Sequence, residues 1–349
     1  TVTDSKGYTL TKALTVLVNA SVSAIGGQNI TTTRAYQDTY TTFTFSGGTG
    51  SLTSALSGTS SSYITYDSST GRLTVASGVA VGTYYETITA TDSLGMTGTQ
   101  SVTILINAVV SVTGTSSFTA TYGFARTLDT FTATGGTGTK TFALSPGDSH
   151  MSINSATGAI TLDSTTASGT YNETITATDS VGASGTKAIT IVVASSISIS
   201  GGSNVYATYG FAKYSTAFTA SNGTGTKTWS LLNNPSGVSI DTNTGVIYVD
   251  SSTAVGTYTV TVKATDSLGA YSTTTMTVTE YSAIVLSGGS AITTTSGIAE
   301  TATAVTYTGG AGGIVWTLSD NRTGLSIDTQ GRIKVSTSAS AGTFWETVT

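Results

Sequence analysis

The chain has 349 residues, of which 38% are hydrophobic and only 9% charged, and its net charge of −5 is small for this length. This balance argues against nucleic-acid binding, which needs clustered lysine and arginine to displace counterions. Without cysteine the chain can form neither disulfides nor thiolate metal sites, and no apolar run approaches the roughly 18 residues that suggest a membrane-spanning helix.

The chain opens with TVTDSKG, and the TDS triplet returns three times. Its aspartate falls at regular spacings of 88, 87 and 87 residues, at Asp4, Asp92, Asp179 and Asp266. Such regularity is typical of tandem structural repeats.

Three further segments recur between successive triplets, always in the same order. First comes a glycine turn, GGTG at 47–50 and 135–138, NGTG at 222–225 and GGAG at 309–312. A glycine of a second turn follows, at Gly71, Gly158, Gly245 and Gly331. A Gly-Thr-Tyr/Phe segment then begins at Gly82, Gly169, Gly256 and Gly342. The constant phase predicts four copies of a module of about 87 residues.

Within each module the hydrophobic pattern has a period of two. In GTYTVTVKATDS, for example, Val260, Val262 and Ala264 alternate with threonine and lysine, which indicates a half-buried strand. Threonine, valine and isoleucine dominate these runs, and turn signals separate them every 8–12 residues or so. The pattern predicts an all-β protein of tandem Ig-like β-sandwich modules arranged end to end.

We place the module boundaries after each final predicted strand. Residues 1–20 are expected to be the C-terminal hairpin half of a preceding module. The predicted modules are 21–108, 109–195, 196–282 and 283–349, the last lacking its final strand.

The segment FTASNGTGTKTWSLLNNPSGVSIDTNTGVIYVDSSTAVGTYTVTVKATDSLGAYSTTTMTV, residues 218–278, resembles the putative-Ig, cadherin-like tandem repeats of large bacterial surface proteins. The shared pattern is a glycine turn, a W-S-L strand, a hairpin ending in T-G, then G-T-Y and T-D-x-x-G. All four modules carry it, and the third fits best. The resemblance implies an extracellular spacer, stalk or adhesin repeat.

The TDS aspartates allow two interpretations. Cadherin-type domains place acidic residues at module ends, which makes Asp92, Asp179 and Asp266 candidate calcium ligands. Calcium needs six to eight oxygens, and here only one aspartate recurs per module with no acid in the linking segments. We favour a turn in which the carboxylate accepts backbone N–H bonds, and expect no metal or other cofactor.

Two further sets of polar residues occupy fixed positions. Turn chemistry is the favoured role of the hairpin residues and their glycines: Asp67, Gly71, Asn154, Gly158, Asp241, Gly245, Asp328 and Gly331. Alternation places an acid of unknown role on the inward face, at Glu86, Glu173 and Glu346. Some bacterial surface Ig-like domains use a buried acid to promote a Lys–Asn isopeptide cross-link. A lysine coincides with the inward acid only in module 2, as Lys140 with Glu173, so a general cross-link is not supported.

No residue pattern points to catalysis. The single histidine, His150, has no second histidine or cysteine near it in sequence, and one histidine cannot give every repeat a Ser-His-Asp triad. The tyrosines of TYGFA at 121–125 and 208–212 are either a contact surface or, more simply, packing residues near the first strands. We therefore expect no enzyme.

Fourfold repetition without a concentrated chemical site favours a structural extracellular repeat protein forming a stalk, fibre or filament on a bacterial surface. Expected partners are neighbouring copies or further repeats of the chain, head to tail, and glycans or cell-surface proteins if the chain is adhesive. The alternatives are an adhesin array that binds carbohydrate or protein through module loops, and a non-catalytic spacer of a larger secreted protein.

The two ends of the sequence share one phase, because Thr1 and Thr349 both correspond to Thr89. One explanation is a window from a longer repetitive chain. The other is that LTKALTVLV of one subunit completes module 4 of the next, as in donor-strand pili. A sandwich without its last strand would otherwise expose an apolar edge.

Overall fold

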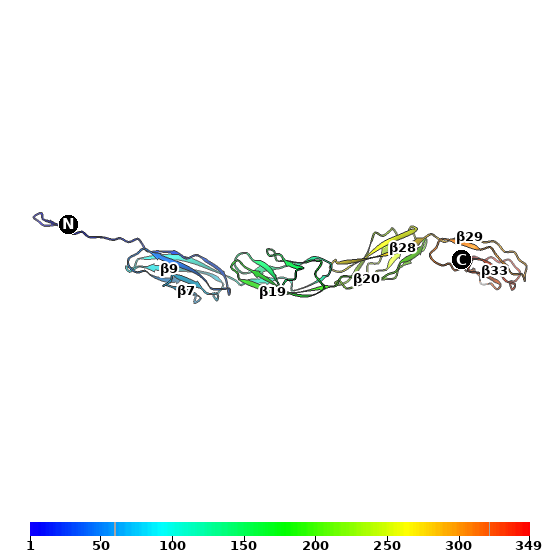
Figure 1. The fold of residues 1–349 in the computed structure, drawn as a ribbon, viewed down its shortest axis with the longest axis horizontal. Coiled ribbons are helices and arrows are strands. Elements are labelled where there is room, and N and C mark those ends of the chain that lie inside the picture. The colour runs from blue at the N-terminus through cyan, green and yellow to red at the C-terminus, as the bar shows by residue number, and fades with distance from the viewer. Residues whose placement is uncertain (59–60, 321) are drawn as a thin grey trace. The chain divides into compact units, whose positions relative to one another are not determined.

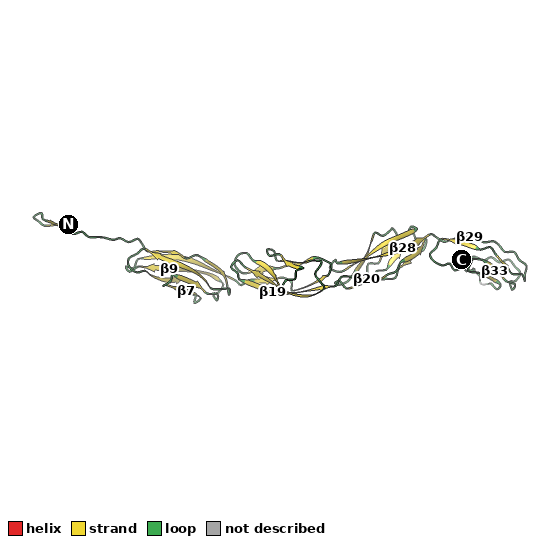
Figure 2. Ribbon diagram, viewed as in Figure 1, coloured by secondary structure: helices red, strands yellow, loops and turns green. Residues whose placement is uncertain are grey.

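The computed structural model describes residues 1–58, 61–320 and 322–349, and these contain strands but no helix (Figure 2). The prediction of an all-β protein of tandem Ig-like modules is confirmed. The chain forms two compact units, each of which we describe by itself. The first unit comprises Thr1–Phe118, Ala125–Thr166 and Thr170–Val192, and the second comprises Thr119–Phe124, Ala167–Gly169 and Val193–Thr349.

Residues 1–20 form only a short hairpin, in which β1 (Val2–Thr3) pairs with β2 (Thr9–Leu10). Asp4 Oδ1 accepts the N–H groups of Lys6 and Tyr8 in its turn. The strand expected over LTKALTVLV ends at Leu10, and the apolar side chains beyond it are exposed. In module 1 the corresponding β10 (Thr97–Asn107) lies between two other strands, and the described residues offer 11–18 no such sheet.

Module 1 is a sandwich of two four-stranded sheets, and β7 and β9, labelled in Figure 1, lie in different sheets. One sheet has the order β4-β10-β9-β6 with β4 parallel to β10, and the other has the order β3-β5-β8-β7. Between them pack Phe43, Leu73, Ile88 and Ile104, all at most 2% exposed. The remaining strands are β3 (Ser23–Gly26), β4 (Ile30–Thr33), β5 (Thr39–Ser46), β6 (Thr53–Gly58), β7 (Ile64–Asp67), β8 (Arg72–Val75) and β9 (Gly82–Thr91).

Module 2 repeats the larger sheet as β12-β19-β18-β15, beside the three-stranded sheet β13-β17-β16 and the pair β11-β14. Its fully buried side chains include Phe131, Ile160, Ile175 and Ile191. The strands are β11 (Ser111–Thr113), β12 (Ser117–Thr121), β13 (Arg126–Thr130), β14 (Thr132–Thr134), β15 (Thr141–Ser145), β16 (Met151–Ile153), β17 (Ala159–Leu162), β18 (Gly169–Thr178) and β19 (Ser184–Ala194).

Module 3 has the same three groups of strands: β21-β28-β27-β24, β22-β26-β25 and β20-β23. The alternation seen in GTYTVTVKATDS holds, because Val260, Val262 and Ala264 are fully buried around Trp229. The strands are β20 (Ser198–Gly201), β21 (Val205–Thr208), β22 (Lys213–Tyr214), β23 (Phe218–Ser221), β24 (Thr228–Leu232), β25 (Val238–Ile240), β26 (Ile247–Val249), β27 (Gly256–Thr265) and β28 (Tyr271–Tyr281).

Module 4 keeps the pair β29-β31 and the sheet β30-β33-β32. In the described residues the final segment, 342–349, forms an isolated bridge between Val348 and Leu318, flanked by backbone hydrogen bonds from Thr317 to Thr349 and from Ser319 to Thr347, and has no partner strand along its other edge. Trp345 is 86% exposed, at the outward-facing position where module 1 has the 67% exposed Tyr85. The strands are β29 (Val285–Gly288), β30 (Glu300–Thr301), β31 (Val305–Thr308), β32 (Leu325–Ile327) and β33 (Ile333–Val335).

Module 1 carries an alanine in a left-handed backbone conformation, Ala35 with φ of 61°. The corresponding residues of the other modules, Gly123, Gly210 and Gly297, have φ between 87° and 96°. Left-handed geometry costs a non-glycine residue roughly 1–2 kcal/mol. We expect Ala35→Gly to stabilise module 1 by about 1 kcal/mol and to slow hydrogen exchange of the β4 and β10 amides.

The matched control is Gly123→Ala in module 2. A Cβ there would meet no heavy atom within 4 Å, so only the backbone conformation would be strained. This variant should exchange faster than the unsubstituted chain. Faster exchange in Ala35→Gly would contradict the assignment of strain to Ala35.

Candidate functional site: the junctions between modules

Each glycine turn is bonded to the last residue before its own module. The N–H of Gly48 donates to the carbonyl of Ala20, and Gly136 donates in the same way to Ala108. The corresponding later pairs are Gly223 with Ser195 and Gly310 with Ser282, and all four distances lie between 2.7 and 2.9 Å. A Cβ on Gly135 would lie 2.1 Å from the carbonyl oxygen of Val109, whereas the equivalent residue of module 3 is Asn222, which adopts a left-handed φ of 61°.

The TDS aspartate lies beneath this turn and is hydrogen bonded through both oxygens. In module 2, Asp179 Oδ1 accepts the N–H groups of Val181 and Ala183 at 3.0 and 2.9 Å. Its Oδ2 accepts the N–H of Thr137, in the glycine turn, at 2.8 Å. Asp92 and Asp266 make the same three bonds, to Leu94, Met96 and Thr49 and to Leu268, Ala270 and Thr224. This is the geometry of an Asx-type turn tied to a neighbouring loop.

A threonine from the preceding module completes the arrangement. The Thr33 hydroxyl, at the end of β4, donates to Asp179 Oδ2 at 2.5 Å and lies 2.9 Å from the Thr137 hydroxyl. Thr121, part of the second unit, makes the same contacts with Asp266 at 2.6 Å and Thr224 at 2.8 Å. We call each set a junction clasp: Thr33–Thr137–Asp179 and Thr121–Thr224–Asp266.

Both clasps are buried, with Asp179 6% and Asp266 5% exposed. Burial alone would raise the pKa of Asp179, but the Thr33 hydroxyl and the N–H groups of Thr137, Ala183 and Val181 favour the charged form more strongly. The pKa of Asp179 is lowered as a result, and the carboxylate is ionised at neutral pH. The pKa of Asp266 is lowered by the equivalent balance of burial and hydrogen bonds.

The TYGFA segments also lie at the junctions. Tyr36 of module 1 stands at the position that Phe124 occupies in module 2. A Cβ on Gly182, in the TDS turn of module 2, would lie 2.3 Å from the Tyr36 hydroxyl oxygen. Phe124 approaches Gly269 in the next TDS turn, where a Cβ on that glycine would lie 3.5 Å from the ring. An aromatic side chain of one module therefore packs against the TDS turn of the next.

Two contacts show how far the junction pattern extends. Asn19 donates to the Thr49 hydroxyl at 3.0 Å, as Asn107 does to Thr137. At the start of module 4, Thr208 accepts the N–H of Ala311 at 2.9 Å, and Ala311 stands where the other modules have threonine. Parts of one junction thus recur at every module boundary.

No group of three or more histidine, cysteine, aspartate or glutamate side chains within the described residues could hold a metal ion. The oxygens of Asp179 are already engaged by four donors. We therefore expect EDTA to leave the melting temperatures of the chain unchanged in scanning calorimetry. A fall that added calcium reverses would contradict the turn role proposed for these aspartates.

The hairpin residues form a second set of side-chain turns. Asn154 and Asp241 each accept two backbone N–H groups through Oδ1, and Asp67 accepts that of Ser69. The Ser69 and Thr70 hydroxyls lower the pKa of Asp67 to about 2. Asp328 accepts hydrogen bonds from the backbone N–H groups of Arg332 and Gln330, and these bonds lower its pKa. The following glycines have φ between 68° and 74°: Gly71, Gly158, Gly245 and Gly331.

The inward glutamates lie beside the loop that follows the W-S-L strand. Glu173 Oε2 accepts the N–H of Gly147 at 2.9 Å, and Glu346 Oε2 accepts that of Asp320 at 3.1 Å. Glu86 is 1% exposed and pairs in register with Gly58 at the end of β6. Lys140 lies too far from Glu173 to form a cross-link that this acid promotes. Lys140 precedes Thr141, which pairs with Thr178 at one end of the β15–β18 pair. Glu173 precedes Thr174, which pairs with Ser145 at the other end.

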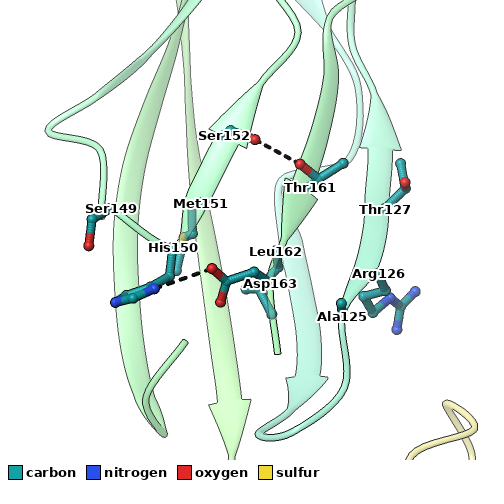
Figure 3. A pocket seen from close by; sticks show the side chains of 10 residues that line it. All are labelled: Ala125, Arg126, Thr127, Ser149, His150, Met151, Ser152, Thr161, Leu162 and Asp163. Atoms are coloured by element: carbon teal, nitrogen blue, oxygen red, sulfur yellow. Dashed lines mark hydrogen bonds and ion pairs between the residues drawn. The ribbon is translucent and has the colours of Figure 1, made fainter. Parts of the chain in front are cut away.

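His150 lines an open depression of about 460 Å³ in module 2 (Figure 3). Its Nδ1 lies 3.2 Å from Asp163 Oδ2 and 2.8 Å from the Thr165 hydroxyl. The serine hydroxyl of Ser152 pairs instead with Thr161 at 2.8 Å. Asp163 and Thr165 both contact the same ring nitrogen, whereas a triad places the acid and the nucleophile on opposite nitrogens, so the described contacts of His150 do not make a triad.

The clasp threonines and one buried acid were not predicted from the sequence. The threonines at 33, 121, 208 and 295 share the phase of the other repeats, so aligning polar positions would have found them. Glu280 occupies the position of Ile106 and Val193 and is 1% exposed, and among the described residues neither of its carboxylate oxygens has a hydrogen-bond partner. Burial raises its pKa.

Comparisons with known proteins agree with the sequence-based resemblance. Residues 195–280 match the family described as "Putative Ig domain", which confirms that resemblance where it is strongest. No curated protein matches the chain. Similar solved structures include mouse cadherin-23 EC22-24 (18% identity, 75% of this chain and 99% of that one, TM-score 0.31). They also include titin domains I67-I69 (12%, 75% and 98%, 0.40) and the human desmocollin-1 ectodomain (12%, 96% and 78%, 0.32).

Proposed function

We propose that the chain is a structural, extracellular repeat protein that forms part of a stalk, fibre or filament on a bacterial surface. The observation that carries this proposal is the junction clasp, which uses the same residue types at the same phase in two successive junctions. A free linker would leave module orientation undefined. A buried charged hydrogen bond between modules instead favours one orientation.

The chemistry of the clasp suits a load-bearing array. It uses hydroxyls, amides and one carboxylate per junction, so it needs neither a metal nor a disulfide. The partners we propose are further Ig-like modules, in the same chain or in neighbouring copies, head to tail. Ig-like and cadherin-like families are typically non-enzymatic, and we propose no catalytic role and no cofactor.

Immunogold electron microscopy of intact source cells tests this function. Antibodies raised against the 349-residue chain should label a continuous or stalk-like structure outside the cell envelope. Permeabilised cells provide the control for internal antigen. Label that appears only after permeabilisation would overturn the proposal.

A further inference from the structure

Modules 2 and 3 each have a shallow depression on the outer face of the three-stranded sheet. The depression in module 2 lies over β13, β16 and β17 (Figure 3), and the one in module 3, of about 450 Å³, lies over β22, β25 and β26. Their linings include equivalent positions 87 residues apart: Thr127 and Tyr214, Ser152 and Ser239, Thr161 and Tyr248. The two depressions therefore overlap at these three positions, where the side chains differ between the modules at two of them.

The largest change is at the cross-strand pair. Thr127 lies opposite Thr161 in module 2, whereas Tyr214 lies opposite Tyr248 in module 3. The two rings have centroids 5.0 Å apart and planes tilted by 43°, and Tyr214 is 63% exposed. Tyr248 is partly buried beside it. Accessible tyrosine rings offer a large, rigid, amphipathic contact area with little entropy to lose on binding. The junctions make no use of this pair.

Acceptor groups border the two rings. Asp241 uses Oδ1 for the N–H groups of Asn243 and Thr244, and a carboxylate has acceptor capacity beyond two such bonds. These N–H bonds lower its pKa, so it is charged at neutral pH. Ser239 and Thr244 add hydroxyls to the lining, and Asp250 accepts the Tyr248 hydroxyl at 3.3 Å.

We propose that this surface of module 3, the Tyr214–Tyr248 site, binds the pyranose ring of a neutral oligosaccharide. The C–H groups of one sugar face suit the negative faces of the two rings. The hydroxyl groups at the sugar edge can donate hydrogen bonds to the Asp241 carboxylate. A proline-rich peptide would also fit tyrosines but brings few donors for a carboxylate, and an acidic sugar would be repelled by Asp241 and Asp250. The site does not depend on the proposed structural role of the junctions.

Saturation-transfer difference NMR with the whole 349-residue chain tests the site. The probes are three neutral trisaccharides: cellotriose, maltotriose and triacetylchitotriose. At least one should bind in the millimolar range. Affinity should fall about tenfold in Tyr214→Ala/Tyr248→Ala and about threefold in Asp241→Asn, a change that module 2 already tolerates at Asn154.

The control variant is Tyr206→Ala, because Tyr206 is a 53% exposed tyrosine of the same module that does not line the depression. It should bind like the unsubstituted chain. With Trp316 and Trp345 replaced by phenylalanine, emission from the buried Trp229 should be unchanged in every variant. The proposal is overturned if none of the three sugars binds, if the double variant binds equally well, or if only a proline-rich peptide binds.

Discussion

Replacing Asp179 by alanine is expected to destabilise module 2 by about 2–4 kcal/mol, the largest loss we expect from a single junction substitution. The change leaves the N–H groups of Thr137, Val181 and Ala183 and the hydroxyl of Thr33 without their acceptor. Buried donors that lose a charged acceptor carry the full cost of their desolvation. Hydrogen exchange measured peptide by peptide should show faster exchange in β18 and β19.

Thr33→Val is the matched variant for the contact between modules. It removes only the hydroxyl and leaves the three N–H bonds of Asp179 in place. We expect a loss of about 1 kcal/mol, and a coupling energy with Asp179→Ala in a double-mutant cycle. Additive effects of the two substitutions would contradict a direct bond between Thr33 and Asp179.

The lowered pKa values also predict the acid response of the clasps. A carboxylate with a lowered pKa in the folded state stabilises the fold above its unfolded pKa of about 3.9. That contribution from Asp179 and Asp266 is lost as the pH falls through their lowered folded values. The clasps are therefore expected to be intact at neutral and mildly acidic pH.

Replacing Glu280 by valine is expected to stabilise module 3 at pH 7 by about 2 kcal/mol. The carboxyl is buried without a hydrogen-bond partner in the part of the chain that the structure describes, at a position where modules 1 and 2 have Ile106 and Val193. Valine removes the unpaired polar group and keeps the apolar contacts. Emission from Trp229 during urea unfolding reports on this module when Trp316 and Trp345 are replaced by phenylalanine.

The effect should depend on pH in a defined direction. Burial raises the pKa of Glu280, so the folded state holds a proton that the unfolded state releases above a pKa of about 4.3. Module 3 is thus most stable below that pH, and it loses stability as the pH rises toward the raised folded pKa. Glu280→Val should lack this decline. A variant that declines in parallel with the unsubstituted chain would contradict the role of Glu280.

The sequence predicted the fold because repetition and alternation are both local signals. Val260, Val262 and Ala264 are buried as their pattern indicates, and a period of two leaves no other regular choice. Residues 11–18 carry the same alternation but form no strand in the described part of the chain. A strand requires a partner, and a pattern alone does not supply one.

The junctions were only partly predictable. The Asx turn follows from the local sequence around Asp179, but the bond to Thr33 joins residues 146 positions apart. Thr33 was also inconspicuous among many threonines, because a clasp residue differs from its neighbours only in where the fold places it. Glu280 had a visible signal, since Met276, Val278 and Glu280 alternate on the inward face of β28. That Glu280 has no hydrogen-bond partner among the described residues could be recognised only from the folded module.

Pulsed electron–electron double resonance, which measures the distance between two spin labels, tests most directly whether the clasp fixes one module to the next. The chain has no cysteine, so nitroxides can be attached at Ser101→Cys and Ala188→Cys, exposed and equivalent positions of β10 and β19 within the first unit. We expect one narrow distance distribution, which broadens in Thr33→Val and in Asp179→Asn. A distribution that is equally wide with and without the Thr33 hydroxyl would contradict the account.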